Sequence, residues 1–169
     1  VVRSIRHIHR VYYHAKTNYW YVTTGDEGSE CMLIRGRYDV ATDKWSWKIL
    51  GSGIEYKFGN IMIDDNNIAY LVTDYTDPSL QDKKGVYRVH AKYLDDITKY
   101  RYVYRCDRTE WGNIAPVSLL MDNNGNKVLL PDYLGAGWIW VARDGVNFQK
   151  VKVSPNVLLT YTIGENYNG

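Results

Sequence analysis

Cysteine, proline and phenylalanine are scarce in this sequence of 169 residues, with 2, 4 and 2 copies respectively. Its two cysteines, Cys31 and Cys106, show neither Cys-x-x-Cys nor Cys/His spacing, so the sequence predicts no metal site of that kind and no cofactor. Each lies in or directly beside an expected strand, which favours two reduced, half-buried thiols, with one disulfide as the alternative. No apolar run approaches the roughly 18 residues of a transmembrane helix, so no membrane span is predicted.

The sequence also lacks a large excess of positive or negative charge. The chain has 21 Lys and Arg residues against 19 Asp and Glu residues, which gives a net charge of +2. The charges are mixed along the sequence, and without a basic tract nothing indicates nucleic acid binding. The sequence starts at Val1 without Met or a signal-like segment, so we expect it to be an excised or processed piece of a longer polypeptide.

Tyrosine and tryptophan, in contrast, are abundant, with 16 and 6 copies. Both residues join an apolar body to a polar tip, which suits half-buried strands and wet binding surfaces. The composition therefore favours a β-rich protein with an aromatic binding surface.

Two sequence patterns recur along the chain in the same order. The first is a strand-like run with an aspartate at or after its end, at residues 21–26, 70–75 and 128–133. The second occurs at residues 38–47, 93–102 and, in shorter form, 142–151. Asp26, Asp74 and Asp132 lie 48 and 58 residues apart, and a period near 50 is typical of propeller blades.

Alternation of strand-forming and polar residues predicts about twelve short strands and almost no helix. The expected strands are 5–14, 20–24, 32–38, 44–50, 59–63, 68–73, 86–93, 100–106, 117–121, 128–130, 138–142 and 148–153. On the first strand Ile5, His7, His9, Val11 and Tyr13 are expected on one face. On the fourth, Trp45, Trp47 and Ile49 share a face.

Four short antiparallel strands repeated radially form a propeller blade. We therefore predict an all-β chain with blades at residues 1–52, 53–110 and 111–155, and the first strand of a further blade, strand 158–163, within 156–169. A many-stranded β-sandwich is the alternative, and the repeat order argues against it. Because closed propellers typically have about 4–8 blades, a partner is expected, either the remainder of the same polypeptide or another copy.

The segment from Ala142 to Phe148 resembles an Asp-box, the Ser-x-Asp-x-Gly-x-x-Trp hairpin of the sialidase-like (BNR-repeat) propellers. Ala142 stands in place of the serine and Phe148 in place of the tryptophan, and segments starting at Asp39 and Asp95 are weaker matches. Residues 7–26 resemble the first two strands of a blade in bacterial and phage members. In such a box the carboxylate, here Asp144, accepts hydrogen bonds from loop amides, so its role is structural.

This resemblance implies a carbohydrate partner, a cell-surface or cell-wall glycan, and an extracellular or virion location. A receptor-binding region of a phage tail fibre or a bacterial carbohydrate-active protein fits it. A glycoside hydrolase is the first alternative, with Asp26, Glu27, Asp74 or Asp132 as candidate catalytic carboxylates, and a structural assembly propeller is the second. The arginine triad and the Tyr–Glu pair of sialidases cannot be placed on this sequence.

Histidines and carboxylates are expected to meet at one mouth of the central channel of the expected propeller. His7 and His9 would line the inner wall, while Asp26, Asp74 and Asp132 end the second strand of successive repeats. A histidine pair beside carboxylates suits metal binding or acid–base work. The alternatives are histidines bonded to neighbouring backbone and aspartates that cap turns.

Aromatic loop residues complete the expected glycan site. Sugars stack their C–H faces on aromatic rings while their hydroxyls bond to polar side chains. Tyr75, Tyr133 and Trp111 lie in expected loops beside Asp or Asn residues and are predicted ligand contacts. For Trp111, packing between blades is an equal alternative.

Overall fold

The computed structural model describes residues 5–75, 78–105, 116–122, 124–131 and 138–152. Within these ranges the protein consists of β-strands and short 3-10 turns, without an α-helix. The first four strands are β1 Ile8–His14, β2 Tyr19–Thr24, β3 Met32–Asp39 and β4 Lys44–Ser52. The next are β5 Phe58–Ile63, β6 Ile68–Thr73, β7 Gly85–His90 and β8 Arg101–Arg105. The last are β9 Pro116–Met121, β10 Lys127–Pro131, β11 Trp138–Ala142 and β12 Gln149–Lys152.

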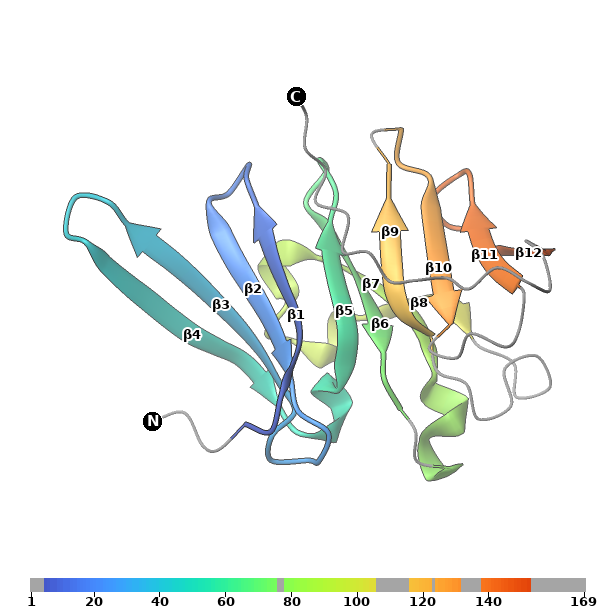
Figure 1. Cartoon of the computed structure of the whole chain (residues 1–169), viewed down its shortest axis with the longest axis horizontal. Coiled ribbons are helices and arrows are strands. Elements are labelled where there is room, and N and C mark those ends of the chain that lie inside the picture. Colours follow the sequence, from blue (N-terminus) through green and yellow to red (C-terminus); the bar gives the residue numbers. More distant parts are fainter. Residues whose placement is uncertain (1–4, 76–77, 106–115, 123, 132–137, 153–169) are drawn as a thin grey trace.

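These strands form three four-stranded antiparallel sheets in sequence order, which confirms that part of the fold prediction. We call them the first sheet (β1–β4), the middle sheet (β5–β8) and the third sheet (β9–β12). The first strands of the three sheets, β1, β5 and β9, lie side by side (Figure 1). The expected strand 158–163 lies outside the described residues.

The described parts of the connections contain four 3-10 turns, at η1 Ile54–Tyr56, η2 Pro78–Lys83, η3 Ala91–Tyr93 and η4 Ile97–Lys99. The strand expected over 86–93 therefore ends at His90, because η3 takes its last three residues. None of the helical turns in the described ranges could cross a membrane.

The middle sheet is buried on both faces. In β6, Ala69 and Leu71 join a core shared with the first sheet, while Tyr70 and Val72 join a second core shared with the third sheet. Successive side chains of a strand point to opposite faces, so this run is apolar on both sides. Burying each large side chain contributes about 1.5–3 kcal/mol, which fixes the stacking of the three sheets.

The outer face of the first sheet is open and aromatic. Trp45, Trp47 and Ile49 share this face, as the alternation predicted, and are 47%, 53% and 49% exposed. The Trp45 and Trp47 rings stack with centroids 5.0 Å apart. Val11 and Tyr13 of β1 are also half exposed. We call these five residues the Trp45 face, and a patch of this kind is typical of an interaction surface.

Aspartates hold the tight turns between strands. In the turn from third to fourth strand, Asp39, Asp96 and Asp144 each accept a hydrogen bond from the backbone N–H two residues later. Two of these are the expected Asp-box residues, but in the middle sheet Asp96 acts in place of Asp95. Asp95 instead lies 3.2 Å from the ammonium of Lys48. Asp64 and Asp122 make the same bond in the turns from first to second strand.

Replacing Asp144 with Ala is expected to lower the melting temperature. The affinity for a ligand that binds elsewhere on the protein should not change. Hydrogen bonds from the backbone amides of Asn147 and Val146 lower the pKa of the Asp144 carboxyl group. A carboxyl group whose pKa is lowered by folding stabilises the protein above its unfolded pKa, about 3.9, and this contribution disappears as the pH falls. The difference in melting temperature between wild type and Asp144→Ala should therefore stay constant from about pH 6 to about pH 4 and shrink as the pH falls below about 3.9. Equal melting temperatures at pH 6 would refute the role.

Exposure of the Trp45 face predicts that the isolated chain associates. Sedimentation velocity on the isolated 169-residue chain should show concentration-dependent species larger than the monomer. The double variant Trp45→Ser, Trp47→Ser should shift the distribution toward monomer, because it removes the apolar area that drives association. Tyr93→Ser is the control, since Tyr93 is 40% exposed in the turn η3, outside the Trp45 face. A monomeric wild type would contradict the prediction.

Candidate functional site

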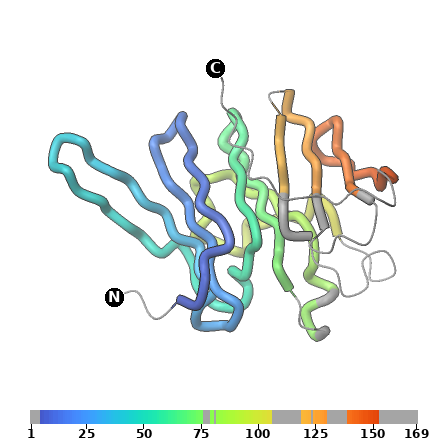
Figure 2. The backbone as a smooth tube through the Cα atoms, in the orientation of Figure 1, coloured from blue at the N-terminus to red at the C-terminus, as the bar shows by residue number. Residues whose placement is uncertain are grey.

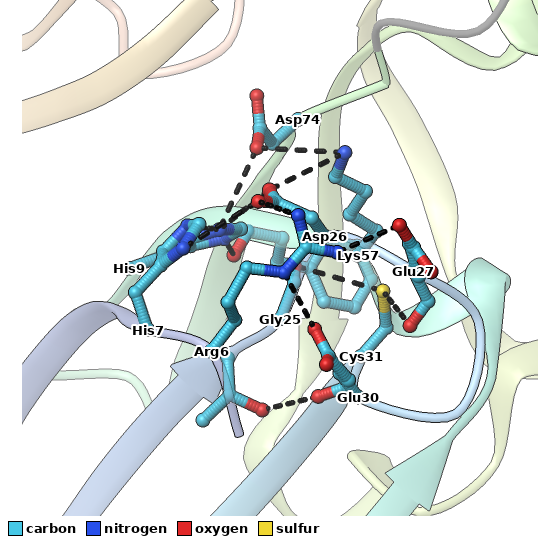
Figure 3. A network of polar contacts seen from close by, with 12 residues as sticks. Arg6, His7, His9, Gly25, Asp26, Glu27, Glu30, Cys31, Lys57 and Asp74 are labelled. Carbon is cyan, nitrogen blue, oxygen red and sulfur yellow. Dashed lines mark hydrogen bonds and ion pairs between the residues drawn. The ribbon is translucent and has the colours of Figure 1, made fainter. Parts of the chain in front are cut away.

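Charged side chains from two sheets converge at one edge of the structure. His7 precedes β1 and Asp26 follows β2, while Lys57 precedes β5 and Asp74 follows β6. In antiparallel sheets the start of one strand and the end of the next lie at the same edge. The backbone trace shows these segments together at the lower edge of the first and middle sheets (Figure 2). We call His7, His9, Asp26, Lys57 and Asp74 the edge cluster (Figure 3).

A β-bulge aims His9 into the cluster. Ile8 pairs with Thr24 and Arg10 pairs with the preceding Thr23, so His9 is an extra residue in the ladder. Bulges re-aim side chains in this way. The regular alternation expected over 5–14 is therefore wrong at its start: the strand begins at Ile8, and His7 lies before it. Because of the bulge, His9 contacts the middle sheet, whereas Val11 and Tyr13 belong to the open Trp45 face.

The same bulge occurs in all three sheets. Gly59 is the extra residue in β5, between Phe58 and Asn60, and Val117 is the extra residue in β9. In each case it is the second residue of the first strand. The bulge is thus a repeated element, and only in the first sheet does it carry an imidazole.

His9 is held in one orientation by the middle sheet. Its Nδ1 lies 3.0 Å from the carbonyl oxygen of Phe58, which can only accept, so Nδ1 carries the hydrogen. Nε2 then presents a lone pair to the cluster. It lies 2.8 Å from Nε2 of His7, 3.6 Å from Oδ1 of Asp26 and 3.7 Å from Oδ2 of Asp74.

Lys57 joins the carboxylates of the two sheets. Its ammonium lies 3.7 Å from Oδ1 of Asp26 and 3.9 Å from Oδ2 of Asp74. The lysine is only 5% exposed. A buried ammonium is tolerated when carboxylates pair with it. Lys57 therefore fixes Asp26 and Asp74 on either side of one buried charge.

The loop that carries Asp26 is itself tightly held. Gly25 has a φ of +81°, and a Cβ there would lie 2.2 Å from the carbonyl of Glu30. The Thr24 hydroxyl donates to the same carbonyl at 2.7 Å, and the Cys31 thiol donates to the Glu27 carbonyl. Burial raises the pKa of the Cys31 thiol to about 11, so this free cysteine is an unreactive structural residue.

Arg6 closes the solvent side of the cluster. Its guanidinium donates to Oε1 of Glu27 at 2.7 Å and lies 3.9 Å from Oδ2 of Asp26. A third carboxylate, that of Glu30, lies 3.7 Å away. Glu27, a candidate catalytic residue, is thus an exposed rim residue bound to an arginine.

A pocket of about 240 Å³ adjoins the cluster. Its lining includes Asp26, Glu27, Lys57 and Tyr75. Tyr75 is 3% exposed, and its hydroxyl donates to the Glu55 carbonyl at 3.2 Å. Its ring therefore forms a wall of the pocket and is not an open stacking platform.

The structure brings together four of the residues that the sequence singled out, His7, His9, Asp26 and Asp74. Trp111, Asp132 and Tyr133 lie outside the described residues. Sequence reasoning missed Lys57 and Arg6. Lys57 directly precedes the first strand of its sheet, as His7 does, so aligning the repeats at this position would have found it.

Comparison of the chain with protein-family models and with curated proteins gives no match. The resemblance to sialidase-like propellers therefore stays a prediction from sequence motifs. What the chain does has to be argued from the geometry of the edge cluster.

Replacing Lys57 with Met is expected to destabilise the protein by up to about 3 kcal/mol, because it leaves two carboxylates without their buried counter-charge. Adding Asp74→Asn to Lys57→Met should recover part of this loss, since it removes one of the two carboxylates. Chemical denaturation of the wild type, both single variants and the double variant measures the coupling. Strictly additive effects would show that Lys57 and Asp74 do not interact.

Proposed function

We propose that the chain is part of a sialidase-like β-propeller that binds a surface glycan at the edge cluster. Three four-stranded antiparallel sheets in series, with their first strands side by side, support the propeller assignment. The observation that carries the binding proposal is the convergence of Asp26 and Asp74, from equivalent positions in consecutive sheets, on Lys57 and His9.

A carbohydrate fits the chemistry of this edge. Sugar hydroxyls both donate and accept hydrogen bonds. The cluster offers carboxylate acceptors beside the ammonium donor of Lys57, and the adjoining Arg6 adds a guanidinium donor. Fixed side chains need no reordering when a ligand binds, which favours affinity. Four carboxylates, on Asp26, Glu27, Glu30 and Asp74, face the cations of Arg6 and Lys57. The negative excess disfavours acidic sugars and favours a neutral glycan.

Binding is better supported than hydrolysis. A glycosidase needs one carboxyl group that carries a proton and one that is ionised, in different environments. Here Asp26 and Asp74 both lie beside Lys57 and His9, and Asp26 also lies beside Arg6 and His7. The shared partners give no sign that one carboxylate is set apart as the acid and the other as the base.

Assembly is the second candidate function, and the Trp45 face favours it. Its stacked tryptophans lie on the outer face of the first sheet, opposite the core shared with the middle sheet. We propose that a further four-stranded sheet, from the remainder of the polypeptide or another copy, packs there to extend the propeller. An extracellular or virion receptor-binding role is consistent with both functions.

Asp74→Asn is expected to weaken glycan binding by about 1–3 kcal/mol if Asp74 is a central contact, because an amide replaces a charged acceptor. Affinity electrophoresis through gels that contain neutral or acidic polysaccharides measures the effect and the preference for neutral glycans. Asp95→Asn, an exposed carboxylate remote from the cluster, is the control. Binding unchanged in Asp74→Asn but lost in Trp111→Ala would place the site elsewhere.

A further inference from the structure

We propose that His7, His9 and Asp26 form a binding site for a divalent transition-metal ion of the zinc type. The sequence lacks the usual Cys/His spacing of a zinc site, although a histidine pair beside carboxylates suits metal binding. The structure brings the bulged His9, His7 and a carboxylate that follows the next strand to one place. The proposal stands without the carbohydrate proposal, since metal binding is measured without any glycan.

The three side chains lie close enough for one ion to reach all of them. Each offers one ligand atom, and these atoms all lie within 4.8 Å of one another. Nε2 of His9 lies 2.8 Å from Nε2 of His7 and 3.6 Å from Oδ1 of Asp26, while Oδ2 of Asp26 lies 3.4 Å from Nδ1, the other ring nitrogen of His7. Zinc bonds of about 2.0–2.2 Å place tetrahedral ligands roughly 3.3–3.6 Å apart. A rotation of the exposed His7 ring would set one of its nitrogens at this spacing from both other ligand atoms.

The second coordination shell is present as well. Metal-binding histidines usually donate their other ring N–H to a carbonyl or carboxylate, which fixes the tautomer and the ring. His9 does this through Nδ1 and the Phe58 carbonyl, and its side chain is only 8% exposed. Nε2 therefore faces the cluster, and the rings of His7 and His9 lie together beside Asp26 (Figure 3).

The charge around the site calls for a cation. With neutral imidazoles, the carboxylates of Asp26, Glu27, Glu30 and Asp74 outnumber the cations of Arg6 and Lys57 by two. One divalent ion would balance this excess. Lys57 lies beside Oδ1 of Asp26, while Oδ2 lies 3.4 Å from Nδ1 of His7, so this oxygen remains on the imidazole side.

The donor set selects the class of metal. Imidazole nitrogens suit zinc and other late transition metals, whereas calcium and magnesium prefer all-oxygen sites. Three protein ligands leave a fourth position open to water or a ligand, as in zinc sites that act on bound molecules. Asp74, 3.7 Å from Nε2 of His9, borders that position.

The test uses untagged protein stripped with a chelator and dialysed to equilibrium against Zn²⁺, with bound zinc measured by mass spectrometry and affinity by calorimetry. We expect one zinc per chain in the wild type. His7→Ala and Asp26→Asn should each weaken the affinity at least tenfold, the scale on which even outer partners of a metal site act. His90→Ala is the matched control, because His90 lies at the end of β7 outside the cluster.

Because His7 is exposed and lies before β1, His7→Ala is expected to fold. The test therefore does not depend on a variant of the less exposed His9. Cobalt substitution gives a second readout, because tetrahedral Co²⁺ with nitrogen ligands absorbs visible light. A visible band in the wild type and the His90 variant, and none in His7→Ala, would support the site. Zinc affinity unchanged in His7→Ala, equal loss in His90→Ala, or no zinc bound by the wild type would overturn it.

Discussion

Burial of the middle sheet on both faces is the constraint on which the rest of the structure depends. Alternate residues of β6 belong to two different cores, one shared with each neighbouring sheet. Such a strand is stable only with a sheet on either side, because each large apolar side chain left in water would forfeit about 1.5–3 kcal/mol. The stacking that results sets β1, β5 and β9 side by side and brings strand ends from separate sheets to one edge.

The edge cluster follows from this stacking. A repeated bulge near the start of each first strand opens the ladder, and in the first sheet the extra residue is His9. Lys57 would be costly to bury alone, and the aspartates after β2 and β6 supply its counter-charges. Paired ionic groups of this kind add little net stability, and this supports the proposal that the edge cluster serves binding.

Sequence patterns predicted the sheets well because alternation and turn residues act locally. The Trp45 and Trp47 face and the aspartate turns follow from period-two spacing and turn chemistry. The convergence of Asp26 with Asp74 followed from the repeat. A bulge, in contrast, depends on the partner strand, so the orientation of His9 was not predictable from alternation. Lys57 was missed, and the burial of Tyr75 was not predicted, because burial of a polar side chain depends on residues distant in sequence.

The central claim is that His7, His9 and Asp26 act together as one site at the edge between the first and middle sheets. The most direct measurement is a crystal structure of zinc-soaked protein with anomalous diffraction at the zinc absorption edge. One strong peak is expected within bonding distance of Nε2 of His9, a ring nitrogen of His7 and the Asp26 carboxylate. Zinc bound only elsewhere, or His7 and His9 rings that point away from each other, would contradict it.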